Sequence, residues 1–434
     1  MTTAASPNVL APRRRLGLFD VLCIGVNAIV GSGVFALPDD MQRAMGGWSP
    51  LAYLLCAVVL LPVALCFAEL AGRYEETGGP YLYAQRAFGD RIGYVVGWFC
   101  WTTAFVSWAA NTTLFVELLG LRGALGKAVC AGVILGLGAV NYIGVKLGAW
   151  VVNAVVVGKL LAIFCFLGVA LLAVDPSRLG GPLPHGLAGV GTGVYLALFP
   201  LQGFEVTPVP AGEVKDPRRT IPLATVGSLL FAALLFIVVQ AALVATYPAI
   251  GQESQTPLAD AAAHLGPRIG LLVLVGSFVS IGGFNAGSAL GSPRYAQAIA
   301  ARGLLPAQLA KVHPRFQTPH LAIAVTTGFS ALLAICFDYR RLVGMSNLTI
   351  VVQYACTCLA VPVLRRIEPQ VEAAAGAPRR WVVPGGVLIP FAGAAGSISL
   401  LAGAERVEFA FAAGILALGA LVAFLARRSA SSPK

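Results

Sequence analysis

A stretch rich in glycine, residues 25–35, interrupts apolar sequence near the start of the chain. It contains Gly31, Ser32 and Gly33, and Pro38 follows it. Each glycine costs a helix about 1 kcal/mol relative to alanine, so we expect a helix to unwind here. Unwound backbone exposes N–H groups, and the N-terminus of the next helical segment carries partial positive charge. Groups of this kind bind a carboxylate.

A second stretch, residues 198–205, combines Pro200, Gly203 and the acid Glu205, with two further prolines close behind. Proline has no backbone donor and clashes with the preceding turn, so this stretch cannot form one regular helix. The carbonyls freed at such a break suit an ammonium group. Donors at one break and acceptors at the other match an α-amino acid zwitterion. A ligand without a carboxylate would leave the donors unpaired, at about 1–3 kcal/mol for each buried group.

The composition places both stretches in a membrane protein. Hydrophobic residues make up 58% of the 434 residues and charged residues 11%, against about 45–50% and about 25% in soluble domains. The mean hydropathy is +0.81. These values exclude a soluble globular protein, a disordered chain and a disulfide scaffold. An all-α polytopic membrane protein remains, since no alternating strands of the barrel type occur.

Twelve apolar runs are long enough for transmembrane helices, which need about 20 residues each. They are 17–44, 48–71, 91–117, 124–144, 148–174, 188–212, 221–247, 268–298, 318–336, 342–364, 383–402 and 407–426. The interruptions fall in runs 1 and 6. Because run 6 comes five runs after run 1, an odd number, the two runs enter the membrane from opposite sides. This placement indicates an inverted repeat of five plus five helices. Gly and Pro are also common in transmembrane helices, so helix packing at the glycines is the alternative interpretation.

The repeat divides the chain into parts. We predict a cytoplasmic tail, two five-helix repeats, a pair formed by helices 11 and 12, and a second tail, at 1–16, 17–174, 188–364, 383–426 and 427–434. Most Lys and Arg residues fall in loops on the side of the N-terminus, which places both termini in the cytoplasm and the protein in the cell membrane. The net charge of +11 is therefore a signal of orientation, and we expect no nucleic acid partner.

The sequence pattern offers no metal, cofactor or enzyme site. The nine cysteines fall in apolar runs and the four histidines in loops, without the spacing of a metal site. Paired carboxylates and histidine clusters are missing from the apolar runs, which argues against a membrane-embedded enzyme. The pattern Gly-x4-Gly-Lys-Ser/Thr is also missing, so we expect no ATP. A channel, which would conduct without saturation, is a further alternative.

Several short motifs resemble the amino acid–polyamine–organocation (APC) superfamily of transporters. In chain order they are Gly31-Ser32-Gly33-Val34-Phe35, Gly78-Gly79-Pro80-Tyr81, Gly203-Phe204-Glu205, Gly212-Glu213-Val214-Lys215-Asp216-Pro217, Ala301-Arg302-Gly303-Leu304-Leu305-Pro306 and Val312-His313-Pro314-Arg315-Phe316. The resemblance implies the LeuT-type fold, with twelve transmembrane helices, the five-plus-five inverted repeat and broken helices 1 and 6. It also implies a secondary active amino acid transporter that works by alternating access.

The resemblance implies roles for residues at the two breaks. The substrate carboxylate should meet backbone and side-chain donors of the first break, and its ammonium should meet carbonyls of both. The predicted substrate-binding residues are Ile29, Gly31, Ser32, Gly33, Phe199, Gln202 and Gly203. Phe204 is predicted to gate the site. Trp101 and Trp108 share one helical face and either line the substrate path as further gates or pack within the scaffold.

Ionisable residues at membrane depth are functional candidates. Lys159 lies midway along the fifth run, about 16 Å from either interface at the rise of a helix. In many members of the superfamily a lysine here replaces a sodium ion, so we expect Lys159 to contact carbonyls near 28–31 and a hydroxyl such as Ser280 or Ser288. A proton on Lys159 would couple transport to pH, and a purely structural ammonium is the alternative. Glu205 either caps the second break or accepts a proton or a substrate cation.

The substrate class is predicted from what the site lacks. Ser280, Phe284 and Ser288 share one face of run 8, and no acid lies there to meet a basic side chain. Phe199 stands where carriers of basic amino acids and polyamines often have tryptophan. We therefore predict a neutral amino acid, moved by proton coupling or exchange, with a cationic amino acid or polyamine carrier as the alternative. The expected partners are the substrate, the lipid bilayer and, with coupling, a proton; the sequence does not fix the oligomeric state.

Overall fold

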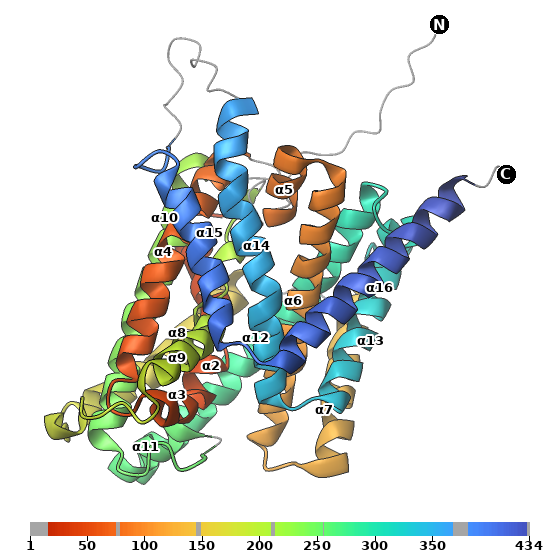
Figure 1. Ribbon diagram of the computed structural model, residues 1–434. Helices are drawn as coiled ribbons and strands as arrows, with labels where there is room; N and C mark the ends of the chain where they lie inside the picture. The colour runs from red at the N-terminus through yellow and green to blue at the C-terminus, as the bar shows by residue number, and fades with distance from the viewer. Residues whose placement is uncertain are drawn as a thin grey trace, which may run out of the picture.

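The computed structural model describes residues 16–74, 79–144, 149–209, 213–254, 256–367 and 381–431. Within these ranges the regular structure is helical, and β-pairing is limited to two isolated bridges, Leu16 with Val214 and Gly47 with Gly180. The helices pack side by side into one bundle (Figure 1). The predicted all-α class is confirmed for this part of the chain.

Nine helices of the described part are long and apolar enough to cross a membrane. They are α4 (Pro50–Arg73), α6 (Asp90–Glu117), α7 (Gly123–Tyr142), α8 (Ala149–Ala170), α9 (Gly186–Leu201), α10 (Pro217–Thr246), α12 (Pro267–Ala301), α14 (Tyr339–Ile367) and α16 (Arg406–Ser431). Shorter apolar helices, α1 (Leu18–Ile29), α13 (His320–Cys336) and α15 (Leu388–Ser399), lie in the remaining predicted runs. The protein is therefore a multi-pass membrane protein.

A short helix follows each of two long helices, at opposite ends of the bundle. α5 (Pro80–Phe88) comes after α4, and α11 (Pro257–Leu265) comes after α10. Each has nine residues and begins with proline, whose fixed φ suits the first position of a helix. Figure 1 shows α5 near one end of the bundle and α11 at the other. The two connections are therefore alike in content and opposite in position.

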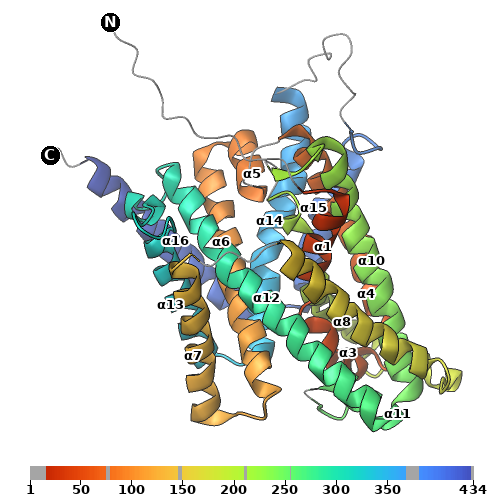
Figure 2. The same cartoon turned by 180° about the vertical axis from the view of Figure 1, so that it is seen from behind.

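The long helices form two groups that meet along α14. In the first group α10 packs on α1 and α4, and α4 packs on α9; in the second, α6 packs on α12 and α13, and α13 on α7. α14 packs against α6 on one side and against α4 and α9 on the other. α8 contacts both α1 and α12, which Figure 2 shows from behind. Both interrupted helices belong to the first group, so the interruptions lie within one packing unit.

Candidate functional site

The first predicted interruption is present in the structure. α1 ends at Ile29, and the short helix α2 (Gly33–Ala36) begins only after Ser32. Val30 leaves the helical conformation, with φ −79° and ψ 77°. The Gly31 N–H donates to the Ile29 carbonyl at 2.9 Å, two residues back. The chain therefore makes a tight turn here, in place of the regular bonds of a helix.

The second predicted interruption is also present, and it lies just after Pro200. Pro200 is inside α9, which ends at Leu201, and the Gln202 N–H still donates to the Leu198 carbonyl at 3.0 Å. Proline near the end of a helix removes a single donor, and the turn closes around it. Gln202 then becomes extended, with ψ 157°, and Gly203 takes φ +123° before the short 3-10 helix η2 (Phe204–Val206). The break therefore occurs at Gln202 and Gly203, within the stretch 198–205 in which the sequence predicted an interruption.

The two breaks lie directly against each other. A Cβ added at Gly203 would lie 2.5 Å from the backbone carbon of Ala28. A Cβ added at Gly33 would lie 2.6 Å from the Cβ of Pro200. Real Cβ atoms do not approach other atoms so closely, so both glycines are required by contact between the broken segments. The crossing point of the two interrupted helices is therefore formed by backbone.

Lys159 donates to the carbonyls at the end of α1. It is fully buried, and its Nζ lies 2.5 Å from the Val30 oxygen and 3.4 Å from the Asn27 oxygen. Ser280 on α12 donates its hydroxyl to the same Val30 oxygen at 3.1 Å. Three elements, α1, α8 and α12, therefore meet at one carbonyl. Ser288 lies about two turns further along α12 and is half-buried.

The donors predicted for a carboxylate meet side chains of other helices. The Ser32 N–H donates to Asn111 Oδ1 on α6 at 3.2 Å, and Ser32 Oγ lies 3.1 Å from the hydroxyl of Tyr339 on α14. Gly31 faces Asn111 and Phe284. A Cβ added at Gly31 would lie 3.4 Å from Oδ1 of Asn111 and 3.4 Å from the ring of Phe284, which is about van der Waals distance. The first break is thus lined by α6, α12 and α14.

Polar side chains of α14 hold the second break. Ser346 donates to Gln202 Oε1 at 3.1 Å, and Gln202 Nε2 donates to Asn347 Oδ1 at 2.8 Å. Further along, the hydroxyl of Tyr354 donates to Glu205 at 2.9 Å. The Gly203 N–H donates to the same Glu205 oxygen at 2.8 Å. Glu205 therefore accepts a backbone donor at the break, which is the capping contact considered from the sequence.

The contribution of α14 to the site was not predicted from the sequence. Its site residues were visible as Ser346 and Asn347 together inside an apolar run, with Tyr354 two turns later. Tyr339, Ser346 or Asn347, and Tyr354 recur at seven or eight residues, which places them on one face of a helix. Such a polar stripe within a transmembrane run is the signal that would have identified this helix.

The predicted gate residues fall in two places. Phe204 is buried, stacks on Tyr354 with ring centroids 5.2 Å apart, and meets Phe67 edge-on at 5.8 Å. Trp101 instead donates its indole N–H to Thr326 on α13 at 2.9 Å. Trp108 is fully buried, and its indole N–H makes no hydrogen bond among the described residues. The structure therefore brings Phe204 to the second break and turns Trp101 toward the scaffold.

A cavity of about 820 Å³ lies on the α14 side of the breaks. Its lining comes from α9, from the first turns of α14 and α16, and from α3 (Pro38–Met45). Leu37 and Asn347 are among the lining residues, and Asn347 is the partner of Gln202. Acidic and basic side chains both line the wall, among them Asp40, Glu408 and Arg340. The cavity is large enough for a small molecule and reaches a residue that contacts the second break.

Residues 16–419 match the amino acid permease family. The chain is 31% identical over 413 residues to an uncharacterized transporter of Mycobacterium tuberculosis, covering 94% of this chain and 90% of that protein. It is 28% identical over 403 residues to the serine/threonine exchanger SteT of Bacillus subtilis, covering 90% of each. It is 27% identical over 380 residues to cationic amino acid transporter 4 of Mus musculus, covering 81% of this chain and 60% of that protein.

Replacing Gly203 by alanine should destabilise the protein by about 2 kcal/mol or more. The positive φ alone costs an L-residue about 1–3 kcal/mol, and the new Cβ would overlap Ala28. Gly287→Ala on α12 is the matched control, because no atom lies within 4 Å of its Cβ position and alanine favours a helix. Unfolding of both variants in detergent measures the difference. Equal stability of the two would contradict the close crossing of the breaks.

Proposed function

Because the chain belongs to the amino acid permease family, whose members are transporters and not enzymes, we propose that it carries an amino acid across the membrane by alternating access. The observation that carries the proposal is the contact between two interrupted helices at Gly203 and Gly33. Backbone at membrane depth gives up helical bonding only where protein or a polar cavity covers it. The backbone groups at such a pair of breaks can bind the polar groups of a substrate, and this binding does not require a charged side chain of the protein.

The fold proposed for this function has twelve transmembrane helices, ten of them in two inverted repeats. α1 and α9 are the interrupted members, and α5 and α11 occupy equivalent connections at opposite ends of the bundle. This arrangement supports repeats at 17–174 and 188–364, with α15 and α16 outside them. In the proposed cycle the group of α1, α4, α9 and α10 moves against the group of α6, α7, α12 and α13. The proposed location is the cell membrane, with both termini in the cytoplasm.

The substrate is proposed to bind with its carboxylate at the first break. The N–H groups of Ser32 and Gly33 and the hydroxyl of Ser32 are the donors, beside Gly31. Asn111 Oδ1 now accepts from Ser32, so a carboxylate oxygen would take over an acceptor position that already exists. The ammonium would meet the carbonyls of Ile29, Phe199 and Gln202, next to Gly203.

A neutral amino acid is the proposed substrate class. The side of the first break that faces α12 presents the aromatic ring of Phe284, and Phe199 packs edge-on against Tyr339 with ring centroids 6.2 Å apart. Glu205 is the nearby acid, and its carboxylate is engaged by Gly203 and Tyr354. A cationic substrate would have to displace these bonds, so a cationic amino acid or polyamine carrier is the second candidate. The relative named as a serine/threonine exchanger supports exchange as one mode of transport.

Lys159 is proposed to couple transport to protons, together with Ser280. An ammonium on the Val30 carbonyl stabilises the end of α1, and a neutral amine would hold it less firmly. Glu205 and Ser288 were also predicted to take part in proton coupling. The contacts of Glu205 support a capping role instead, and Ser288 is proposed to lie on the face of α12 that lines the site. Phe204 is the proposed gate at the second break, whereas the contacts of Trp101 with α13 support packing.

Purified protein should bind leucine about tenfold more tightly than arginine, or with a still larger difference. Tenfold corresponds to only about 1.4 kcal/mol, and an unpaired buried guanidinium costs more than that. Competition of both ligands against a radiolabelled neutral amino acid measures the ratio. Tighter binding of arginine would favour the cationic carrier.

Gly31→Val should abolish binding while the protein remains folded, because it fills the space between Asn111 and Phe284.

Substitution of Lys159 should flatten the pH dependence of uptake. Lys159→Gln keeps a donor for the Val30 carbonyl but carries no titratable proton, and Lys159→Ala removes both. Lys127→Gln is the matched control, since Lys127 is exposed on α7. Initial uptake rates in proteoliposomes across the range from pH 5 to 9 give the profiles. If Lys159→Gln transports with the profile of the parent protein, the lysine is structural and proton coupling through it is rejected.

A further inference from the structure

We propose that the first turn of α14, Tyr339 with Arg340, is the lid that closes the substrate site on the cavity side. The inference rests on the proposed function and names the residues that occlude its site. Tyr339 contacts a residue of each break, and Arg340 fastens the same turn to α3. The lid would therefore hold α14 against the first helix group when the site is closed.

Tyr339 covers both breaks from one side. It is buried, and its hydroxyl lies 3.1 Å from Ser32 Oγ at the first break. Its ring meets Phe199, just before the second break, edge-on at 6.2 Å. Ser32 and Phe199 are residues at which the proposed substrate would bind. A substrate entering from the cavity must therefore displace the contact that Tyr339 makes with at least one of them.

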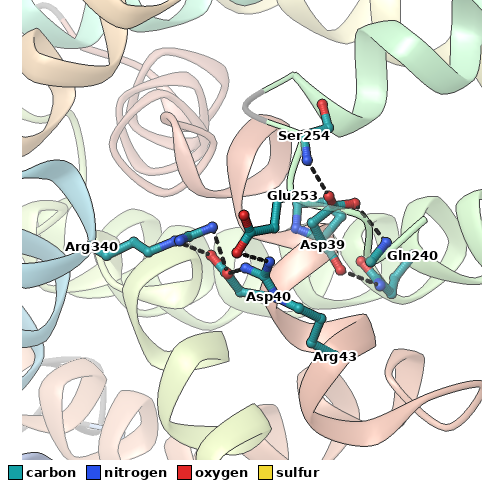
Figure 3. A network of polar contacts seen from close by, with 9 residues as sticks. Asp39, Asp40, Arg43, Gln240, Glu253, Ser254 and Arg340 are labelled. Atoms are coloured by element: carbon teal, nitrogen blue, oxygen red, sulfur yellow. Dashed lines mark hydrogen bonds and ion pairs between the residues drawn. The ribbon is translucent and has the colours of Figure 1, made fainter. Parts of the chain in front are cut away.

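Arg340 forms the ion pair that keeps this turn in place. Its Nε and Nη2 lie 3.1 Å and 3.0 Å from the two carboxylate oxygens of Asp40 on α3 (Figure 3). The side chain of Arg340 is 55% exposed and that of Asp40 12%. A bidentate pair is directional, but one with an exposed partner is weak enough to open and close repeatedly. These properties fit a latch that must release in each cycle.

α3 is held separately on its other side, so the Asp40–Arg340 pair joins the first turn of α14 to an element that is anchored elsewhere. Asp39 accepts the N–H group of Ser254 at 2.6 Å (Figure 3). It also accepts the N–H group of Gly251 at 3.0 Å. Arg43, also on α3, pairs at 3.1 Å with Glu253, which lies in the connection between α10 and α11. These bonds make α3 part of the unit that contains α10. Opening of the Asp40–Arg340 pair would then free α3 from α14 without loosening α3 from its own group.

The cavity lies where a lid of this kind would open. Asp40 and Arg340 both line it, and so do Leu37, the residue that follows α2, and Asn347, the partner of Gln202. The cavity is therefore bounded by the latch on one wall and by a neighbour of the second break on another. Movement of the first turn of α14 would join this space to the breaks.

The test is accessibility of the covered site to a membrane-impermeant thiol reagent. A reporter cysteine, Ser346→Cys, lies beside Gln202 and leaves both contacts of Tyr339 intact. It is placed in protein whose exposed native Cys336 is changed to serine, and protein without the reporter gives the background. We expect Arg340→Gln and Tyr339→Phe each to raise the labelling rate in intact cells at least severalfold. Arg340→Lys keeps the charge and should return the rate most of the way to that of the parent. Raised salt should speed labelling of the parent and leave Arg340→Gln unchanged, since salt screens exposed pairs.

Arg341→Gln is the matched control. Arg341 is adjacent, equally exposed at 57%, and pairs with Asp338 at 3.5 Å within its own turn. Labelling that is unchanged in Arg340→Gln and Tyr339→Phe, or that rises equally in Arg341→Gln, would overturn the lid. The labelling measurement needs no substrate. If labelling changes as expected but the protein binds no amino acid, the proposed function is refuted and the lid is retained. Leucine binding combined with unchanged labelling would refute the lid alone.

Discussion

The carbonyl of Val30 is the point on which the site depends. It stands at the end of α1, where helical bonding has stopped and the residue is fully buried. A backbone acceptor in that position must find donors inside the protein. The Lys159 ammonium and the Ser280 hydroxyl supply them from α8 and α12. The broken end of α1 is thereby connected to helices on both sides, and the geometry of the remaining donors, Ser32 and Gly33, follows from where α1 is made to stop.

Close backbone packing is the second constraint, and it explains why the break at α9 lies where it does. Gly203 and Gly33 permit the interrupted segments to touch, because any side chain at either position would separate them. The α14 side chains then complete the surroundings. Ser346 and Asn347 bind Gln202, and Tyr354 and Gly203 share Glu205. A polar site is built in this way from backbone groups, neutral side chains and the engaged carboxylate of Glu205, and this is the site that we propose for a zwitterion.

Much of this arrangement followed from sequence because glycine, proline and charge are scarce in apolar runs and have few physical uses there. The break after Ile29 was predicted from Gly31 and Gly33, and the position of Lys159 from its depth in the fifth run. The break in α9 was predicted within 198–205 from its prolines and glycine, and tertiary contact selects the residue at which it occurs, here Gly203. The roles of Tyr339 and Arg340 were not predictable, because their partners Ser32 and Asp40 lie some three hundred residues away. The orientation of Trp101 toward Thr326 likewise depends on packing that periodicity does not define.

Binding of matched analogues to the purified protein tests the central claim most directly. Leucine, the amine that lacks its carboxylate, and the acid that lacks its ammonium share one side chain and differ only at the groups that the two breaks should hold. The account predicts that leucine binds and that each analogue loses at least about tenfold in affinity, since each leaves one set of buried groups unpaired. Equal affinity for leucine and either analogue would show that the breaks do not bind a zwitterion.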